Sequence, residues 1–384
     1  MSNPMPATKI LSTDSHVVEP PDLWKGRIPA QYRDRAPKLV ADPTADYWYV
    51  DGIRATTVAS GIQPGQRYEG AKTLRLEGRF SEVKPGAYDP DAKIKAMDLD
   101  GVDGEVVYTT ICMRMWRIPD AGLLMAIQAG YNDWIAEFCR AHPKRLKGIG
   151  LVLLDDVAAG VKELERCAKM GLAGALISVY PHEDLSYDRP MYDPFWAAAS
   201  SLGIPLSLHI GTNRTLPPTS NSNRDMSNSD IKLLSTPALY STFPYWVQMS
   251  LASMIFGGVF ERFPNLQVLS VEHEASWAAF FLNAMDYTYT QRALRANWPR
   301  FKTDAIPSDF FHRNVSLSFQ EDPLAMRLRD VIGVRNLVWG SDYPHPETTF
   351  PKSRETLARI LHGLPEAEQR RIQWENAQAL YRFS

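Results

Sequence analysis

Cysteine is scarce in this sequence, which has only three among 384 residues. Cys112, Cys139 and Cys167 are an odd number and lie far apart, which argues against a disulfide framework and against a zinc–thiolate site. We therefore interpret them as buried apolar side chains. Free cysteines are typical of proteins in a reducing compartment, so we expect a cytoplasmic protein.

An excess of charge of either sign is also missing, because the formal net charge is −2. Nucleic-acid-binding proteins need a basic patch or stripe, and since the sequence contains none, we expect no nucleic-acid partner. Long apolar runs are lacking as well. The most apolar window, 245–260, is shorter than the roughly 20 residues of a spanning helix and contains Gln248 and a glycine pair. The amino terminus does not resemble a signal peptide, so we expect no membrane contact.

What the sequence does contain, with 45% apolar residues, is a regular alternation of short apolar runs and helical patterns. Apolar strands between helices are typical of a parallel sheet covered by helices. Eight strand–helix units predict a closed (β/α)8 TIM barrel of the α/β class. A doubly wound open sheet is the alternative, although no G-x-G-x-x-G follows the first strand. The expected strands cover about 11–16, 104–110, 147–155, 173–180, 204–211, 266–274, 314–320 and 335–342.

A single domain is expected over residues 1–384, because no change of composition marks a boundary. A bare barrel needs about 250 residues, so the surplus predicts insertions after strand one and after strand five. The first covers about 25–90, where "DYWYVDG" and "RATTVAS" predict short hairpin strands. The second is the Ser/Asn/Pro-rich loop 212–230. Long helices are expected at about 119–141 and 241–261.

Side chains that bind metals or transfer protons fall where several predicted strands end. In barrels of this kind the C-terminal strand ends carry the active site. Each residue taken alone could be structural, as a loop cap, a turn residue or an ion-pair partner. Taken together they predict a functional site. Its members are Asp14 and His16 on strand one, His209 on strand five, Glu272 and His273 on strand six, Asp342 on strand eight, and His345 just beyond it.

Asp14 and His16 lie two residues apart, so on a strand both side chains point to the same face and can hold one ion. Imidazole and carboxylate donors together suit Zn, Mn or Fe better than Ca or Mg. We therefore expect a divalent metal ion, zinc in the first place, with Mn and Fe as the alternatives. An open coordination position would hold a water and lower its pKa, and a nearby carboxylate could move the proton.

Three stretches of the sequence resemble the amidohydrolase superfamily: "DSHVVEPPDLW" (14–24), "GGVFERFPNLQVLSVE" (257–272) and "WGSDYPHPETTFP" (339–351). More narrowly, they are similar to the amidohydrolase-related group that includes aminocarboxymuconate-semialdehyde decarboxylase and γ-resorcylate decarboxylase. The resemblance covers nearly the whole chain. It implies a metal-dependent (β/α)8 barrel, commonly with one divalent ion.

The resemblance also implies roles for single residues. His209 matches the metal-binding histidine of strand five, and Asp342 matches the strand-eight aspartate that binds metal and moves protons. We expect an enzyme that hydrolyses, or decarboxylates without oxidation, a small carboxylated organic compound. Arg114 and Arg117, after strand two, are candidates for pairing with the substrate carboxylate. The expected catalytic residues are Asp342, Glu272 and His273.

Two positions depart from this group. Its first-strand His-x-His reads Asp14-Ser15-His16 here, and Glu272 stands at its strand-six histidine. Adjacent strand residues face opposite sides, so either Glu272 or His273 points into the barrel, and both can do so if the strand already ends there. We expect Glu272 to point inward, because its alternation partner Ser270 is small and polar while Val271 suits the helix-facing side. One alternative function is a dinuclear Fe or Mn monooxygenase that uses O2, and another is an inactive metal-binding partner subunit. We expect a homo-oligomer or a pair with a related subunit. Candidate ligands of a second ion are Glu272, His273, His345 and Glu19.

Overall fold

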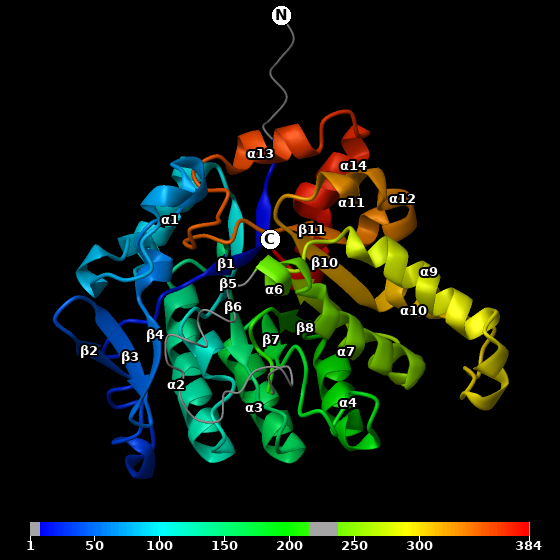
Figure 1. Ribbon diagram of the computed structural model, residues 1–384, viewed down its shortest axis with the longest axis horizontal. Helices are drawn as coiled ribbons and strands as arrows, with labels where there is room; N and C mark the ends of the chain where they lie inside the picture. The colour runs from blue at the N-terminus through cyan, green and yellow to red at the C-terminus, as the bar shows by residue number, and fades with distance from the viewer. Residues whose placement is uncertain (1–7, 215–236, 384) are drawn as a thin grey trace, which may run out of the picture.

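Eight parallel strands form one sheet in the computed structural model, which describes residues 8–214 and 237–383 (Figure 1). Each strand pairs with the next one of this sheet along the chain, so the order around the sheet follows the sequence. All eight lie close to their expected positions. The strands are β1 (Leu11–His16), β5 (Gly104–Tyr108), β6 (Leu146–Leu151), β7 (Gly174–Ile177), β8 (Leu206–His209), β9 (Val268–Val271), β10 (Val315–Phe319) and β11 (Leu337–Trp339).

The sheet closes on itself between its first and last strands. The amide of His16 donates to the carbonyl of Tyr343 over 2.6 Å, and the amide of Asp342 donates to the carbonyl of Asp14 over 2.8 Å. Ser15 and Tyr343 form a parallel bridge at the same place. The predicted (β/α)8 barrel is therefore confirmed, and the open sheet is wrong.

Helices surround the barrel, and the sequence accounts for where several of them begin and end (Figure 1). Asp89, Asp120 and Asp156 each accept a hydrogen bond from a backbone amide of the first helical turn, which is the usual role of an N-cap aspartate. Gly101 and Gly171 end two of these helices with positive φ. The helices of this first half are α1 (Pro90–Asp100), α2 (Ala121–Arg140), α3 (Val157–Met170) and α4 (Asp193–Leu202).

The single helix expected at 241–261 is wrong, because this stretch forms separate helices. Pro244 lies in the first turn of one of them, where a missing amide is tolerated. Gly258 has a φ of 68°, a left-handed conformation that ends the helical backbone before the next helix begins. The helices of the second half are α6 (Pro237–Ser241), α7 (Pro244–Phe256), α8 (Val259–Arg262), α9 (Trp277–Thr290), α10 (Pro307–Asn314), α11 (Pro323–Arg327), α12 (Arg329–Ile332), α13 (Ser353–Ile360), α14 (Glu366–Arg370) and α15 (Asn376–Tyr381).

The insertion after strand one contains the expected hairpin, β3 (Asp46–Val50) and β4 (Ile53–Thr57), and a strand that was not predicted, β2 (Lys38–Ala41). Trp48 of β3 is fully buried and packs edge-on against Trp24, with ring centroids 5.4 Å apart. Most of the loop expected at 212–230, the insertion after strand five, lies outside the described residues.

The insertion also reaches the C-terminal side of the barrel. The amides of Gly65 and Arg67 donate to the carbonyls of His345 and Pro346. The Arg67 guanidinium binds the Glu347 carbonyl over 3.0 Å. The segment after β4 is therefore attached to the loop that follows β11. Among the described residues, no helix is both long and apolar enough to cross a membrane.

Candidate metal centre

Strand β1 carries two of the predicted ligands, Asp14 and His16, and both side chains are buried inside the barrel. Oδ1 of Asp14 lies 3.2 Å from Nε2 of His16. The pairing of β1 with β5 shifts register between Ser12 and Ser15. Such a shift locally redirects a strand, and here it falls at the residue that carries the carboxylate.

His209 ends β8 and meets the same two side chains. Its Nε2 lies 3.4 Å from Oδ1 of Asp14, and its ring centroid lies 5.2 Å from that of His16. Three of the facing atoms, Oδ1 of Asp14, Nε2 of His16 and Nε2 of His209, are buried without a hydrogen-bond partner among the described residues. Buried polar atoms are nearly always satisfied, so three unsatisfied ones in one place fit a bound cation.

The other nitrogens of these rings are fixed by the main chain. Nδ1 of His16 lies 2.7 Å from the Thr109 carbonyl, and Nδ1 of His209 lies 3.1 Å from the Ile210 carbonyl. A carbonyl oxygen only accepts hydrogen bonds, so each Nδ1 carries a proton. In the neutral ring, Nε2 then presents a lone pair to the centre, as metal-binding histidines require. Without an ion, burial opposes protonation of His209, but the Asp14 carboxylate raises the pKa of this histidine to about 9, so a metal that binds its Nε2 displaces a proton.

The barrel closes where β1 meets the segment that follows β11, a junction called the closing seam, and Asp342 lies on the β11 side of it. Strand β11 ends at Trp339, three residues earlier, and Asp342 adopts a left-handed backbone with φ of 59°. Its Oδ1 lies 3.4 Å from Nε2 of His16 and 2.7 Å from Nδ1 of His345. The expected site on strand eight is thus formed by a turn after the strand.

Glu272 also follows its strand, because β9 ends at Val271 and Glu272 has a φ of 64°. Its Oε2 lies 3.6 Å from Nδ1 of His209, and 27% of its side chain is exposed. Its carboxylate therefore faces the site through a change of backbone direction, not through strand alternation. Donor atoms within 4.8 Å of one another form two groups: Asp14, His16, His209 and Glu272; and His16, Asp342 and His345.

His345 has both ring nitrogens engaged. Nδ1 contacts Asp342, and Nε2 lies 3.0 Å from the hydroxyl of Thr110. The ring therefore fixes the orientation of the Asp342 carboxylate and has no free nitrogen. Thr109 and Thr110 were not predicted as site residues, although two adjacent hydroxyl residues end the strand "GEVVYTT" and could have indicated them.

The remaining proposed ligands do not join either group. His273 is buried, with Nδ1 3.1 Å from the Ser270 hydroxyl and Nε2 unpaired among the described residues. Glu19 accepts hydrogen bonds from the Thr109 hydroxyl and from the amides of Ile111 and Cys112, so it anchors the segment after β5. The structure does not gather Glu272, His273, His345 and Glu19 into a second ligand group.

Comparison with known proteins identifies the family. Residues 73–383 match the model of the family described as Amidohydrolase. The chain belongs to the amidohydrolase family. The resemblance seen in the sequence is therefore confirmed.

Among its relatives, the amidohydrolase is 26% identical to 2-amino-3-carboxymuconate-6-semialdehyde decarboxylase of Dictyostelium discoideum, over 71% of this chain and 72% of that protein. It is 24% identical to γ-resorcylate decarboxylase of Rhizobium sp. over 85% of this chain and 93% of the relative. A solved 5-carboxyvanillate decarboxylase from Novosphingobium aromaticivorans, complexed with manganese and 4-hydroxy-3-methoxy-5-nitrobenzoic acid, shares the fold. Its TM-score is 0.67 at 17% identity, over 98% of this chain and 96% of that one.

The pKa values of the acidic residues at the amidohydrolase site are shifted, because three carboxyl groups are buried close together. Burial opposes ionisation of Asp14, but the adjacent imidazoles of His16 and His209 outweigh it and hold the pKa of Asp14 well below its usual range. Burial and the charge of Asp14 raise the pKa of Asp342 to about 8. Burial and the charge of Asp342 raise the pKa of Glu272 well above its ordinary value. Three carboxyl groups share this space, and a divalent cation would relieve their repulsion.

The two arginines proposed to bind substrate lie near the 3-10 helix Cys112–Met115 that follows β5. Arg114 is exposed. Burial lowers the pKa of His345 to about 3, and the positive charge of Arg114 adds a smaller effect in the same direction; the same charge opposes the rise in the pKa of Glu272. Its charge therefore acts at the mouth of the site. Arg117 is partly buried.

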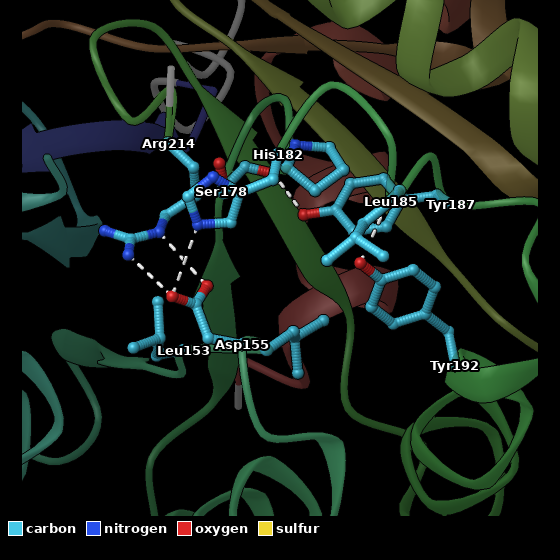
Figure 2. A pocket seen from close by; sticks show the side chains of 10 residues that line it. Leu153, Asp155, Ser178, His182, Leu185, Tyr187, Tyr192 and Arg214 are labelled. Carbon is cyan, nitrogen blue, oxygen red and sulfur yellow. Dashed lines mark hydrogen bonds and ion pairs between the residues drawn. The ribbon is translucent and has the colours of Figure 1, made fainter. Parts of the chain in front are cut away.

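A second polar cluster lies beside the barrel mouth, at the ends of β6, β7 and β8 (Figure 2). Arg214 binds Asp155 through two nitrogens and also donates to the carbonyls of Trp116 and Ile118. His182 lies 3.5 Å from the same aspartate. The enclosed space has a volume of about 10 Å³, which is room for roughly one water. The cluster ties neighbouring loops together and offers no space for a substrate.

Proposed function

We propose that this amidohydrolase binds a divalent metal ion at the barrel mouth and uses it for the non-oxidative decarboxylation of a small carboxylated aromatic compound. The observation that carries the proposal is the convergence of three buried, unsatisfied donor atoms, on Asp14, His16 and His209. Decarboxylation is favoured over hydrolysis because the relatives described above are named as decarboxylases. The proposed ligands are Asp14, His16, His209 and Asp342, with Glu272 at the edge of the site.

A bound divalent ion supplies Lewis-acid polarisation of substrate oxygens. The chain's own residues then have two tasks. They hold the substrate with its carboxyl-bearing carbon beside a proton donor, and they keep water away from that carbon. When the bond between that carbon and the carboxylate breaks, CO2 leaves and the electron pair stays on the ring. One proton must then be delivered to the ring carbon, and we assign this transfer to the Asp342 carboxyl, which His345 orients over 2.7 Å.

Glu272 is assigned a second proton-handling role. It is the most exposed of the carboxylates in the cluster, with 27% of its side chain accessible against 3% for Asp342. It can therefore exchange protons with solvent and restore the proton that Asp342 donates. His273 keeps a buried, unpaired Nε2, and we retain it as a catalytic candidate whose substitution should lower turnover.

Zinc remains the proposed ion, on the strength of the imidazole donors. Manganese is the competing choice, because two of the four proposed ligands are carboxylates, Glu272 adds a third at the edge of the site, and carboxylates suit Mn. One relative of the same fold contains manganese. Elemental analysis of protein purified without chelator decides between them.

The proposal that the substrate is a carboxylate is supported by a positive charge near the metal site. Arg114 is exposed and acts electrostatically on Glu272 and His345, which suits recognition of a carboxylate. Tyr240 of α6 is 58% exposed and packs against Phe243, with ring centroids 4.7 Å apart, and we propose it as a stacking partner for an aromatic substrate. Three buried free cysteines support a cytoplasmic location. Light scattering tests the expected homo-oligomer.

The dinuclear oxygenase is the second candidate function. It is supported by the second donor group, His16, Asp342 and His345. Against it, the two groups share His16, and both nitrogens of His345 are hydrogen-bonded. The inactive partner subunit predicts metal binding without turnover.

One experiment separates these functions. Metal-loaded enzyme is incubated with 2,6-dihydroxybenzoate and 5-carboxyvanillate, with and without O2, while released CO2 and consumed O2 are measured. The decarboxylase releases CO2 equally in both conditions. Turnover that requires O2 would support the oxygenase, and metal binding without turnover on a wider panel of hydroxybenzoates would support the inactive subunit. The His209→Ala variant, which lacks a ligand, controls for background reaction.

A further inference from the structure

Lys93 of α1 has a fully buried side chain, which is unusual for lysine. Its ammonium Nζ lies 2.8 Å from Oε2 of Glu105 on β5, and the Glu105 side chain is only 3% exposed. Burying two charges costs several kcal/mol per ion unless the pair is well formed and further hydrogen-bonded. The other contacts of the ammonium therefore show what this ion pair holds in place.

The ammonium is bound to the end of strand β1. Nζ donates to the hydroxyl of Ser15 over 2.7 Å and to the carbonyl of His16 over 2.9 Å. The Ser15 hydroxyl in turn lies 2.6 Å from the Glu105 carboxylate. This is where the register of β1 against β5 shifts, between Ser12 and Ser15. Lys93 thus supports the segment carrying Asp14 and His16 where regular strand pairing is interrupted.

The same ammonium contacts the other side of the closing seam. Nζ lies 4.9 Å from the centroid of the Tyr343 ring, within the range of a cation–π contact. The carbonyl of Tyr343 accepts hydrogen bonds from the amide of His16 over 2.6 Å and from the hydroxyl of Ser15 over 3.1 Å. Tyr343 directly follows Asp342. One buried charge therefore touches both segments that carry proposed metal ligands.

We propose that Lys93, paired with Glu105, is a positioning residue that fixes these two segments relative to each other and so sets the affinity of the metal centre. The inference rests on the proposed metal-dependent function, which it deepens. Groups that orient metal ligands typically change metal affinity by about 10- to 100-fold when removed. The same loss is expected here, since the Lys93 ammonium is hydrogen-bonded to the carbonyl of His16 itself.

Two variants distinguish an effect of Lys93 on the position of the metal ligands from an effect on folding stability. Lys93→Met leaves the Glu105 carboxylate buried without its partner, so it should lower both the Tm of the metal-free protein and the affinity for Mn²⁺. The double variant Lys93→Met/Glu105→Met removes both charges and restores apolar packing, which is often neutral for stability. We expect its metal-free Tm to return close to that of the wild type. Its Kd for Mn²⁺, measured by calorimetry on chelator-stripped protein, should stay about 10- to 100-fold weaker.

Asn132→Leu is the matched control. Asn132 is a buried polar residue of α2 that bonds both the amide and the carbonyl of Leu151, so it supports β6 and not β1. Its loss should lower Tm and leave the Kd for Mn²⁺ unchanged. A double variant that binds Mn²⁺ as tightly as the wild type would overturn the positioning role, and so would an equal loss of affinity in Asn132→Leu. A wild type that binds no Mn²⁺ and no Zn²⁺ contradicts the metal centre itself, which is a different outcome.

Discussion

Oδ1 of Asp14 and Nε2 of His16 lie 3.2 Å apart, yet neither atom takes part in a hydrogen bond within the described residues. The proton of the His16 ring is on Nδ1, where the Thr109 carbonyl accepts it. Two lone pairs therefore face each other in a buried space. That arrangement is unfavourable for the empty protein and favourable once a cation lies between them.

Removal of the metal should therefore destabilise the barrel. A metal present at about 100 times its Kd adds about 2.7 kcal/mol to the free energy of unfolding. We expect EDTA to lower the Tm of the purified protein and added Mn²⁺ or Zn²⁺ to restore it, as measured by calorimetry. A Tm that does not respond to chelation and to added metal would argue that the three donor atoms hold no ion.

His209→Ala should remove most of the metal and leave the barrel folded. His209 supplies one of the three unsatisfied donor atoms, and the sheet does not depend on its side chain, because β8 pairs with β7 and β9 through the backbone. Metal content by elemental analysis and circular dichroism check the two parts of this prediction. The control is His362→Ala, a change at an exposed histidine outside the site. Full metal content in His209→Ala would show that the ligand set is wrong.

Metal stoichiometry should be one ion per chain, in the wild type and in both His345→Ala and His273→Ala. Both nitrogens of His345 are occupied by Asp342 and Thr110, so its loss should reduce turnover by about 10- to 100-fold through misorientation of Asp342 and should not remove an ion. Two ions in the wild type, falling to one in either variant, would instead support the dinuclear oxygenase.

The barrel and its first ligand pair could be predicted because both depend on local patterns. Alternation of apolar strands and helices fixes the fold class, and two residues spaced by one on a strand share a face, as Asp14 and His16 do. The apolar strand pattern of residues 335–342 also placed Asp342 near the end of strand eight. In each case the required information lies within a few residues of the chain.

The geometry at strands six and eight could not be predicted in the same way. Glu272 and Asp342 reach the site through left-handed backbone conformations, with φ of 64° and 59°. Such conformations are uncommon outside glycine and leave no pattern in hydrophobicity. The roles of Glu19 and Lys93 depend on partners about 90 and 78 positions away in the chain. These contacts exist only in the folded structure, so a local sequence pattern does not predict them.

Arg114→Met should weaken substrate binding more than it slows the chemical step. If Arg114 pairs with a carboxylate, its loss removes a charged hydrogen bond worth about 1.5–3 kcal/mol, or roughly 10- to 100-fold in KM. We expect kcat to change much less. Steady-state kinetics with a carboxylated substrate measure both constants. The matched control is Arg295→Met, at an exposed arginine next to α9. An unchanged KM would exclude Arg114 as the carboxylate-binding group.

Asp100 should make folding stability depend on pH at a place unrelated to catalysis. Its carboxylate is buried at the end of α1 and accepts hydrogen bonds from the amide and hydroxyl of Ser353. Burial, with a smaller contribution from the charge of Glu105, raises its pKa from 3.8 to about 6. The folded state therefore binds the proton more tightly than the unfolded state does.

The stabilisation from this protonated group is complete below the unfolded pKa of 3.8 and is lost as pH rises through about 6. Asp100→Asn is neutral at every pH and lacks this dependence. The free energy of unfolding of the wild type minus that of Asp100→Asn should therefore fall between pH 4.5 and pH 7, by about 2 kcal/mol. Urea unfolding at the two pH values measures it, with the exposed Asp304→Asn as the control. A difference that stays constant or rises with pH would show that Asp100 is ionised in the folded protein throughout this range.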